Sequence, residues 1–273
     1  MMPINPEDSL LPSTERVSFQ LPVGGACLNV SANLPTGRTT LTQLLPVIQN
    51  LENAIIARIG QEAEQAATPI SCRAGCGACC RQMVPLSFFE AEALAQWFET
   101  LPIERRAELE GRFHLALLAL RDSGVIEKLL DERWALDEEA EIKMAVDYFH
   151  AGVACPFLQD ESCTIHAIRP LSCREYLVTS PPALCQDPSA NQVAGVQLPL
   201  KLSKVLFAFG QQLSQDRRGW VPLIFLMAWR KGEQKPGDYI SGTGEEVLRH
   251  FLKQVEEMSP PKNGQPVETP AGP

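Results

Sequence analysis

The strongest constraint in this sequence is a run of four cysteines within nine residues. This first cysteine block, residues 72–80, contains two glycines that let the backbone turn tightly between the thiols. Its members are Cys72, Cys76, Cys79 and Cys80. A second cysteine block, residues 155–185, contains Cys155, Cys163, Cys173 and Cys185. Eight of the nine cysteines therefore fall into two blocks, and thiols at this density are typical of a metal site.

Eight thiols offer more than one way to bind metal. Four thiolates suffice for one zinc ion or one iron–sulfur cluster, so the two blocks fill two such sites or over-supply one. The adjacent Cys79 and Cys80 are expected to point in different directions, which favours a bridged, two-centre or cluster site over a single mononuclear site. The alternatives without metal are reduced structural thiols or a redox disulfide pair.

Other residues near the cysteines are candidates for supporting roles. His166 follows Cys163 by three residues and is a possible extra ligand. Arg169 and Arg174 lie beside the second block and can donate hydrogen bonds to ligand sulfurs, because four thiolates leave a site anionic. Cys27 stands alone and is predicted to be a half-buried strand residue.

The charge balance and the apolar runs argue against two classes of function. The chain carries 24 Lys and Arg against 33 Asp and Glu, a net charge of −9, so it lacks a basic field for DNA or RNA. The longest apolar run, residues 220–229, contains a proline and is about half as long as a membrane span. The first residues do not form a signal sequence. We therefore expect a cytoplasmic protein without nucleic-acid or membrane partners, in which thiols stay reduced.

Hydrophobic periodicity predicts a mainly α-helical fold with small hairpins. Apolar residues alternate in residues 17–23 and 27–34 around Gly24-Gly25, which predicts an N-terminal β-hairpin. A second small hairpin is expected around residues 159–162, and a short helical turn from Arg169-Pro170 carries Cys173. Capping motifs and apolar spacing predict helices over residues 39–68, 87–101, 103–120, 125–134, 137–149, 200–213 and 245–258.

These elements predict a helical domain closed by a metal site. Residues 39–185 are expected to form the metal-binding domain, and residues 186–258 a C-terminal helical segment that packs on it. Residues 1–38 are expected to be an extension, disordered up to about residue 16 and then forming the hairpin. The proline-rich residues 259–273 are expected to form a disordered tail.

The cysteine motifs also resemble those of a known family. The first block is followed by C-P-F-L at Cys155, C-x-I-H at Cys163 and R-P-L-S-C-R over residues 169–174. With these motifs, residues 70–180 resemble the YkgJ-like cysteine-cluster family, also called CxxCxxCC, a zinc- or iron-chelating domain. The resemblance implies a metal site built from these cysteines, and a relative of the family is a flagellin lysine N-methylase.

Two functions follow as hypotheses. The first is a cytosolic metal-binding protein whose cysteines chelate zinc or an iron–sulfur cluster. The alternative is a cluster-dependent enzyme, a lysine N-methylase-like or redox enzyme with a protein partner or substrate. The spacing Cys72-x3-Cys76-x2-Cys79 matches that of radical S-adenosylmethionine enzymes, but Ala78 replaces their usual aromatic residue. Sequence motifs for nucleotide binding, zinc proteolysis or serine hydrolysis are absent.

Overall fold

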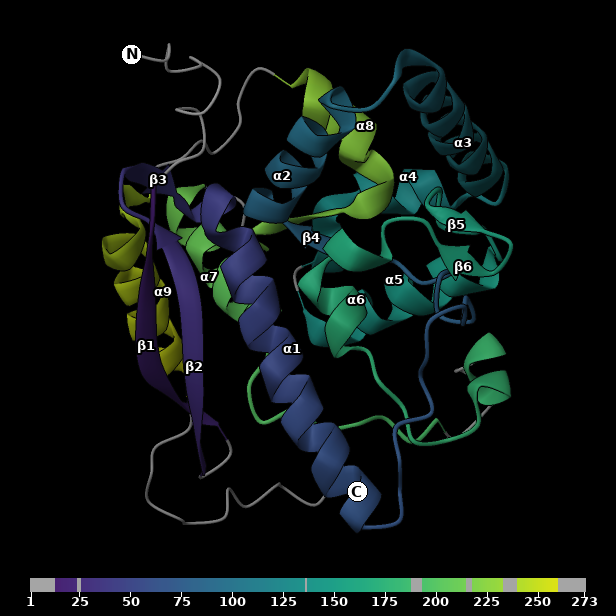
Figure 1. Cartoon of the computed structure of the whole chain (residues 1–273). Coiled ribbons are helices and arrows are strands. Elements are labelled where there is room, and N and C mark those ends of the chain that lie inside the picture. Colours follow the sequence, from purple (N-terminus) through teal and green to yellow (C-terminus); the bar gives the residue numbers. More distant parts are fainter. Residues whose placement is uncertain are drawn as a thin grey trace.

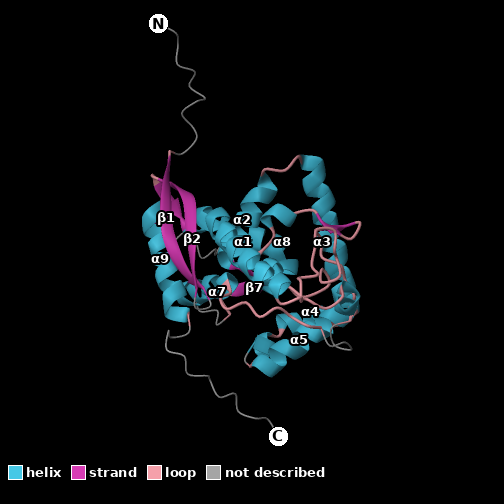
Figure 2. Ribbon diagram, turned by 60° about the horizontal axis from the view of Figure 1, so that its bottom comes forward, coloured by secondary structure: helices cyan, strands magenta, loops and turns pink. Residues whose placement is uncertain are grey.

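The computed structural model describes residues 13–23, 26–135, 137–187, 193–214, 218–232 and 240–259. Over these residues the fold is mainly helical, as the periodicity predicts (Figures 1 and 2). The α-helices are α1 (Leu41–Gln65), α2 (Phe88–Glu99), α3 (Ile103–Asp122), α4 (Val125–Leu130), α5 (Glu138–His150), α6 (Leu171–Glu175), α7 (Leu202–Leu213), α8 (Leu226–Lys231) and α9 (Gly244–Met258). The strands are β1 (Thr14–Val23), β2 (Ala26–Pro35), β3 (Arg38–Thr40), β4 (Pro85–Ser87), β5 (Leu158–Gln159), β6 (Ser162–Cys163), β7 (Trp220–Pro222) and β8 (Ser241–Thr243). They form the antiparallel pairs β1–β2, β3–β8, β4–β7 and β5–β6.

The predicted N-terminal hairpin is confirmed. Strands β1 and β2 pair in a register that places Val23 opposite Ala26, and the buried side chains of Leu21 and Leu34 belong to a core shared with α1 and α9. Figure 1 shows the two strands beside α1 and α9 at one side of the molecule. The short pair β5–β6 confirms the hairpin predicted in the second cysteine block.

Two expectations for the N-terminal region are wrong. Cys27 lies on β2 as predicted, but it is exposed rather than half-buried, because it does not face the core that packs on α1. Strand β1 begins at Thr14, so ordered structure starts inside the segment that was expected to be disordered, where β2 supplies backbone partners. The remaining predictions of disorder concern residues 1–12 and 260–273, which lie outside the described residues.

Helices begin at the residues whose side chains can cap them. Thr40 Oγ1 accepts a hydrogen bond from the amide of Gln43 at 3.3 Å, and Ser87 Oγ accepts one from the amide of Glu90 at 3.2 Å. The side chains of Gln43 and Glu90 accept in return from the amides of the capping residues, which completes two capping boxes. One predicted helix, residues 125–134, is divided: the non-helical backbone of Asp131, with φ −84° and ψ +89°, ends α4 before the 3-10 helix η2 (Glu132–Ala135).

Two hydrophobic cores organise these elements. The first joins β1, β2, α1, α7 and α9, and the second joins α2, α3, α4 and α5 with β4, β7 and α8. Phe157 and Ile165 belong to the second core, and Cys155 and Cys163 pack against it, so the second cysteine block is anchored there. The predicted division into extension, metal-binding domain and C-terminal segment stays a prediction. None of the described helices has the length and apolar character that crossing a membrane requires.

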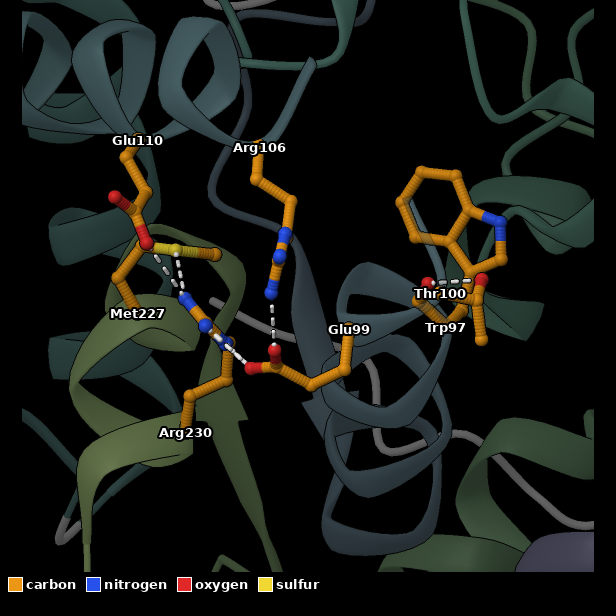
Figure 3. A network of polar contacts seen from close by, with 7 residues as sticks. All are labelled: Trp97, Glu99, Thr100, Arg106, Glu110, Met227 and Arg230. Atoms are coloured by element: carbon orange, nitrogen blue, oxygen red, sulfur yellow. Dashed lines mark hydrogen bonds and ion pairs between the residues drawn. The ribbon is translucent and has the colours of Figure 1, made fainter. Parts of the chain in front are cut away.

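A polar network ties α2, α3 and α8 together (Figure 3). The guanidinium group of Arg230 lies 2.5 Å from Glu99 Oε1 and 3.1 Å from Glu110 Oε1. It also lies 4.2 Å from the ring centroid of Phe98, and Arg106 donates to Glu99 at 2.8 Å. The side chain of Arg230 is only 13% exposed, so it should stabilise the fold more than an ordinary surface ion pair does.

We expect the substitution Arg230→Met to lower the melting temperature by roughly 3–5 °C, because it removes both ion pairs and the cation–π contact. Circular dichroism melts would measure the change. The matched control is Arg249→Met, since Arg249 is 68% exposed and pairs with Glu245 one helical turn away; this change should have almost no effect. Equal losses in the two variants would contradict the role assigned to the network.

Candidate metal centre

The first cysteine block forms a chain of tight turns. The amide of Cys76 donates to the carbonyl of Arg73 at 3.2 Å, and the amide of Cys80 donates to the carbonyl of Gly77 at 2.9 Å. Gly75 has a φ of +81°, a left-handed conformation that glycine adopts without steric cost. The turns place all four thiols of the block within a short stretch of backbone.

The second cysteine block packs directly on the first. The amide of Cys155 donates to the carbonyl of Cys80 at 2.7 Å, and Arg81 forms an ion pair of 2.7 Å with Glu161 in the β5–β6 turn. Gly77 is buried at this contact, and a Cβ atom there would lie 2.7 Å from Glu161 Oε2 and 2.8 Å from Leu158 Cδ1. Blocks about 75 residues apart in sequence are therefore in contact in the fold.

The helix α6 holds Cys173 in place, as the predicted helical turn requires. Pro170 stands before its first residue, and the amide of Leu171 donates to the buried Glu90 Oε1 at 2.7 Å. Glu90 thus uses one carboxylate oxygen for the capping box of α2 and the other for the start of α6. Burial raises the pKa of Glu90, while these hydrogen bonds oppose the rise.

Backbone amides donate to three of the thiol sulfurs. The amide of Val178 lies 3.4 Å from Cys72 Sγ, the amide of Phe157 donates to Cys155, and the amide of Ile165 donates to Cys163. Such hydrogen bonds stabilise the thiolate form of cysteine, and they tune metal centres that cysteine ligates. The amides therefore suit these sulfurs to act as anionic ligands.

Negative charge on Cys79 affects the pKa of most of the other cysteines in the two blocks. Burial raises the pKa of five thiols, and negative charge on Cys79 raises each of them further; these thiols are Cys72, Cys155, Cys163, Cys173 and Cys185. The pKa of Cys155 reaches about 12. Cys185 lies buried in the 3-10 helix η4 (Pro182–Gln186). The charge of Cys79 therefore acts on cysteines of both blocks, Cys185 included.

The adjacent thiols of Cys79 and Cys80 lie in contact, whereas the sequence suggested that they would diverge. A hydrogen bond between the two side chains lowers the pKa of Cys79 to about 7 and raises that of Cys80. The turn at residues 77–82 brings the two side chains to one side, which alternation along an extended chain would not do. Cys79 is accordingly the thiol that loses its proton most readily.

The charged residues near the second block have different partners. Arg169 opposes the effect of burial on Cys72 and Cys163, because its charge lowers the pKa of both thiols. His166 is exposed, and its Nε2 lies 2.6 Å from a guanidinium nitrogen of Arg169; burial and the charge of Arg169 lower the pKa of its ring.

The guanidinium of Arg174 is buried and bonds to oxygen acceptors. It donates to the carbonyls of Arg169 at 3.0 Å and Ala167 at 2.6 Å, and to Asn53 Oδ1 on α1 at 2.9 Å. Arg174 thereby ties the loop before α6 to α1. Cys173, next to it in sequence, is a charge neighbour that raises the pKa of Arg174 against the larger effect of burial.

Sequence reasoning missed two residues that support the cysteines. Glu90 belongs to the capping motif that predicts the helix over residues 87–101, but its bond to Leu171 links positions 81 residues apart. Arg112 on α3 donates to the carbonyl of Leu158 and lowers the pKa of Cys155 against the larger effect of burial. Neither contact has a local signal in the sequence.

The chemistry of the donor set fits a thiolate-bound metal. Zinc and iron–sulfur clusters take cysteine sulfur, and the two blocks supply free thiols, amide donors to sulfur and the cation of Arg169. Within the described part of the chain, no three cysteine, histidine, aspartate or glutamate side chains are grouped so that they could hold an ion.

Comparison with known proteins agrees with this chemistry. Residues 71–193 match a family model described as "CxxCxxCC: Putative zinc- or iron-chelating domain". This match confirms the resemblance expected from the cysteine motifs, and it extends past Cys185. No curated protein and no solved structure gives a significant match.

Proposed function

We propose that the two cysteine blocks chelate zinc or an iron–sulfur cluster with thiolates drawn from both, in a reducing compartment such as the cytoplasm. The main support for this function is the contact between the two blocks at Cys80 and Cys155. This contact brings together two sets of thiol donors that are far apart in the sequence. The ligands come from Cys72, Cys76, Cys79, Cys80, Cys155, Cys163, Cys173 and Cys185.

The protein's own residues prepare the thiols for such a role. Backbone amides donate hydrogen bonds to the sulfurs of Cys72, Cys155 and Cys163, and the positive charge of Arg169 offsets negative charge on the thiolates. Cys79, with a pKa of about 7, supplies a thiolate near neutral pH. Bound zinc would supply a structural cross-link between the blocks, and a bound iron–sulfur cluster would supply electron transfer.

Anaerobic purification followed by metal analysis tests the proposed function. We expect zinc or iron in the reduced, freshly prepared protein, bound in a whole-number ratio to the chain. Visible absorption with acid-labile sulfide would identify an iron–sulfur cluster, and a colourless protein with zinc would identify a zinc site. Protein that contains neither metal, and takes up neither on reconstitution, would refute the function.

A further inference from the structure

A cavity of about 240 Å³ opens beside two of the cysteines. Its walls come from three parts of the chain: Cys79 of the first block with Val84 shortly after it, Cys173 on α6, and Lys201, Lys204 and Phe207 at the start of α7. The volume is below the roughly 300–1,000 Å³ of pockets for drug-sized ligands. The space therefore suits a small molecule.

We propose that this cavity binds a small anion with an apolar body, such as an aromatic carboxylate or phosphate monoester. Its anionic group would lie at Lys201 and Lys204, and its apolar body against Val84 and Phe207. The bound molecule would lie next to the thiols of Cys79 and Cys173.

The two lysines supply the charge that selects an anion. Both are exposed at the cavity, and neither forms an ion pair among the described residues. The ammonium nitrogen of Lys204 is held 5.9 Å from the ring centroid of Phe207, so the cation and the apolar wall occur together. Ammonium groups can make charge-assisted hydrogen bonds to carboxylate or phosphate oxygens.

The carboxylate in the cavity wall is already satisfied. Glu175 is buried, accepts from the amide of Ser203 at 2.8 Å, and accepts from the hydroxyl of Ser203 with its other oxygen. The hydroxyl of Ser172, also in the wall, donates to the carbonyl of Pro85 at 2.7 Å. The charges of Lys201 and Lys204 lower the pKa of Glu175 against the larger effect of burial, and these two lysines are the cations that line the cavity.

This inference deepens the proposed function and rests on it in one respect: the cavity lies beside a metal centre only if the cysteines bind metal. Cys79 and Cys173 are candidate ligands from different blocks, so a molecule in the cavity would lie at the junction of the metal centre. Anion binding itself depends on the lysines and the apolar wall. It can therefore be measured separately from metal content.

Calorimetric titration of the full chain with benzoate, phenyl phosphate, inorganic phosphate and benzyl alcohol tests the proposal. We expect one site for benzoate or phenyl phosphate, with weaker binding of inorganic phosphate and of the neutral alcohol. The double variant Lys201→Met and Lys204→Met should weaken the affinity for the anion by roughly tenfold or more, because methionine keeps the apolar stem but removes the charge. Lys253→Met is the matched control, because Lys253 is exposed on α9.

The outcomes separate this proposal from the proposed metal centre. Preference for the carboxylate over the phosphate, or the reverse, identifies the anionic group. Metal content, measured for each variant, should not change. The proposal is overturned if neither aromatic anion binds, if benzyl alcohol binds as tightly as benzoate, or if Lys253→Met weakens binding as much as the double variant. Each of these results leaves the metal analysis intact.

Discussion

Replacement of Cys163 by serine is expected to remove bound metal and to lower the melting temperature by on the order of 10 °C. Cys163 packs against the second core and receives an amide hydrogen bond from Ile165, so its thiolate would connect that core to the first block. Structural zinc can contribute roughly 10 kcal/mol in small fingers. This chain has two cores of its own and should lose only part of its stability.

The same experiment includes a second ligand and a control. Cys76→Ser should also lower metal content, because Cys76 belongs to the first block. Cys27→Ser should leave metal content and melting temperature unchanged, since Cys27 is exposed on β2. Metal stoichiometry and thermal melts should be measured for all three variants. Loss of metal in Cys27→Ser with full retention in Cys163→Ser would rule out a site shared by the two blocks.

Replacement of the buried Glu52 by glutamine is expected to stabilise the protein at alkaline pH by up to about 3–5 kcal/mol. Glu52 on α1 is completely buried, and one of its oxygens accepts from the amide of Leu202 at 3.3 Å. Burial, and then the negative charge of Glu175, raise its pKa from 4.5 to about 8, while Arg174 and Lys201 oppose the rise. Glutamine keeps an acceptor for Leu202 without the buried charge.

The sign of the effect follows from proton uptake. Because the folded protein holds the proton of Glu52 more tightly than the unfolded chain does, wild-type stability falls as pH rises from 4.5 to about 8. The advantage of the variant should be small at pH 5 and greatest above pH 8. Urea unfolding across this range measures it, with Glu62→Gln as control because Glu62 is exposed on the same helix. A constant difference at all pH values would contradict the raised pKa.

The sequence by itself determined the elements whose signals lie within a few residues. Capping boxes need partners three positions apart, so Thr40 and Ser87 reveal the starts of α1 and α2. Alternation around Gly24-Gly25 predicts the hairpin, and the cysteine motifs predict the resemblance that the family-model match over residues 71–193 confirms. The same local patterns did not reveal that β1 starts at Thr14 or that Asp131 divides a helix.

Only the tertiary structure decided how the candidate site is assembled. The bond from Cys155 to Cys80, the bond from Leu171 to Glu90 and the meeting of Lys204 with Cys79 at one cavity join positions far apart in the chain. Such contacts depend on how α1, α2 and α7 are oriented by the two cores. Every buried side chain of those cores contributes to the orientation. Spacing along the sequence carries no information about these orientations, because they are set by packing between elements rather than within them.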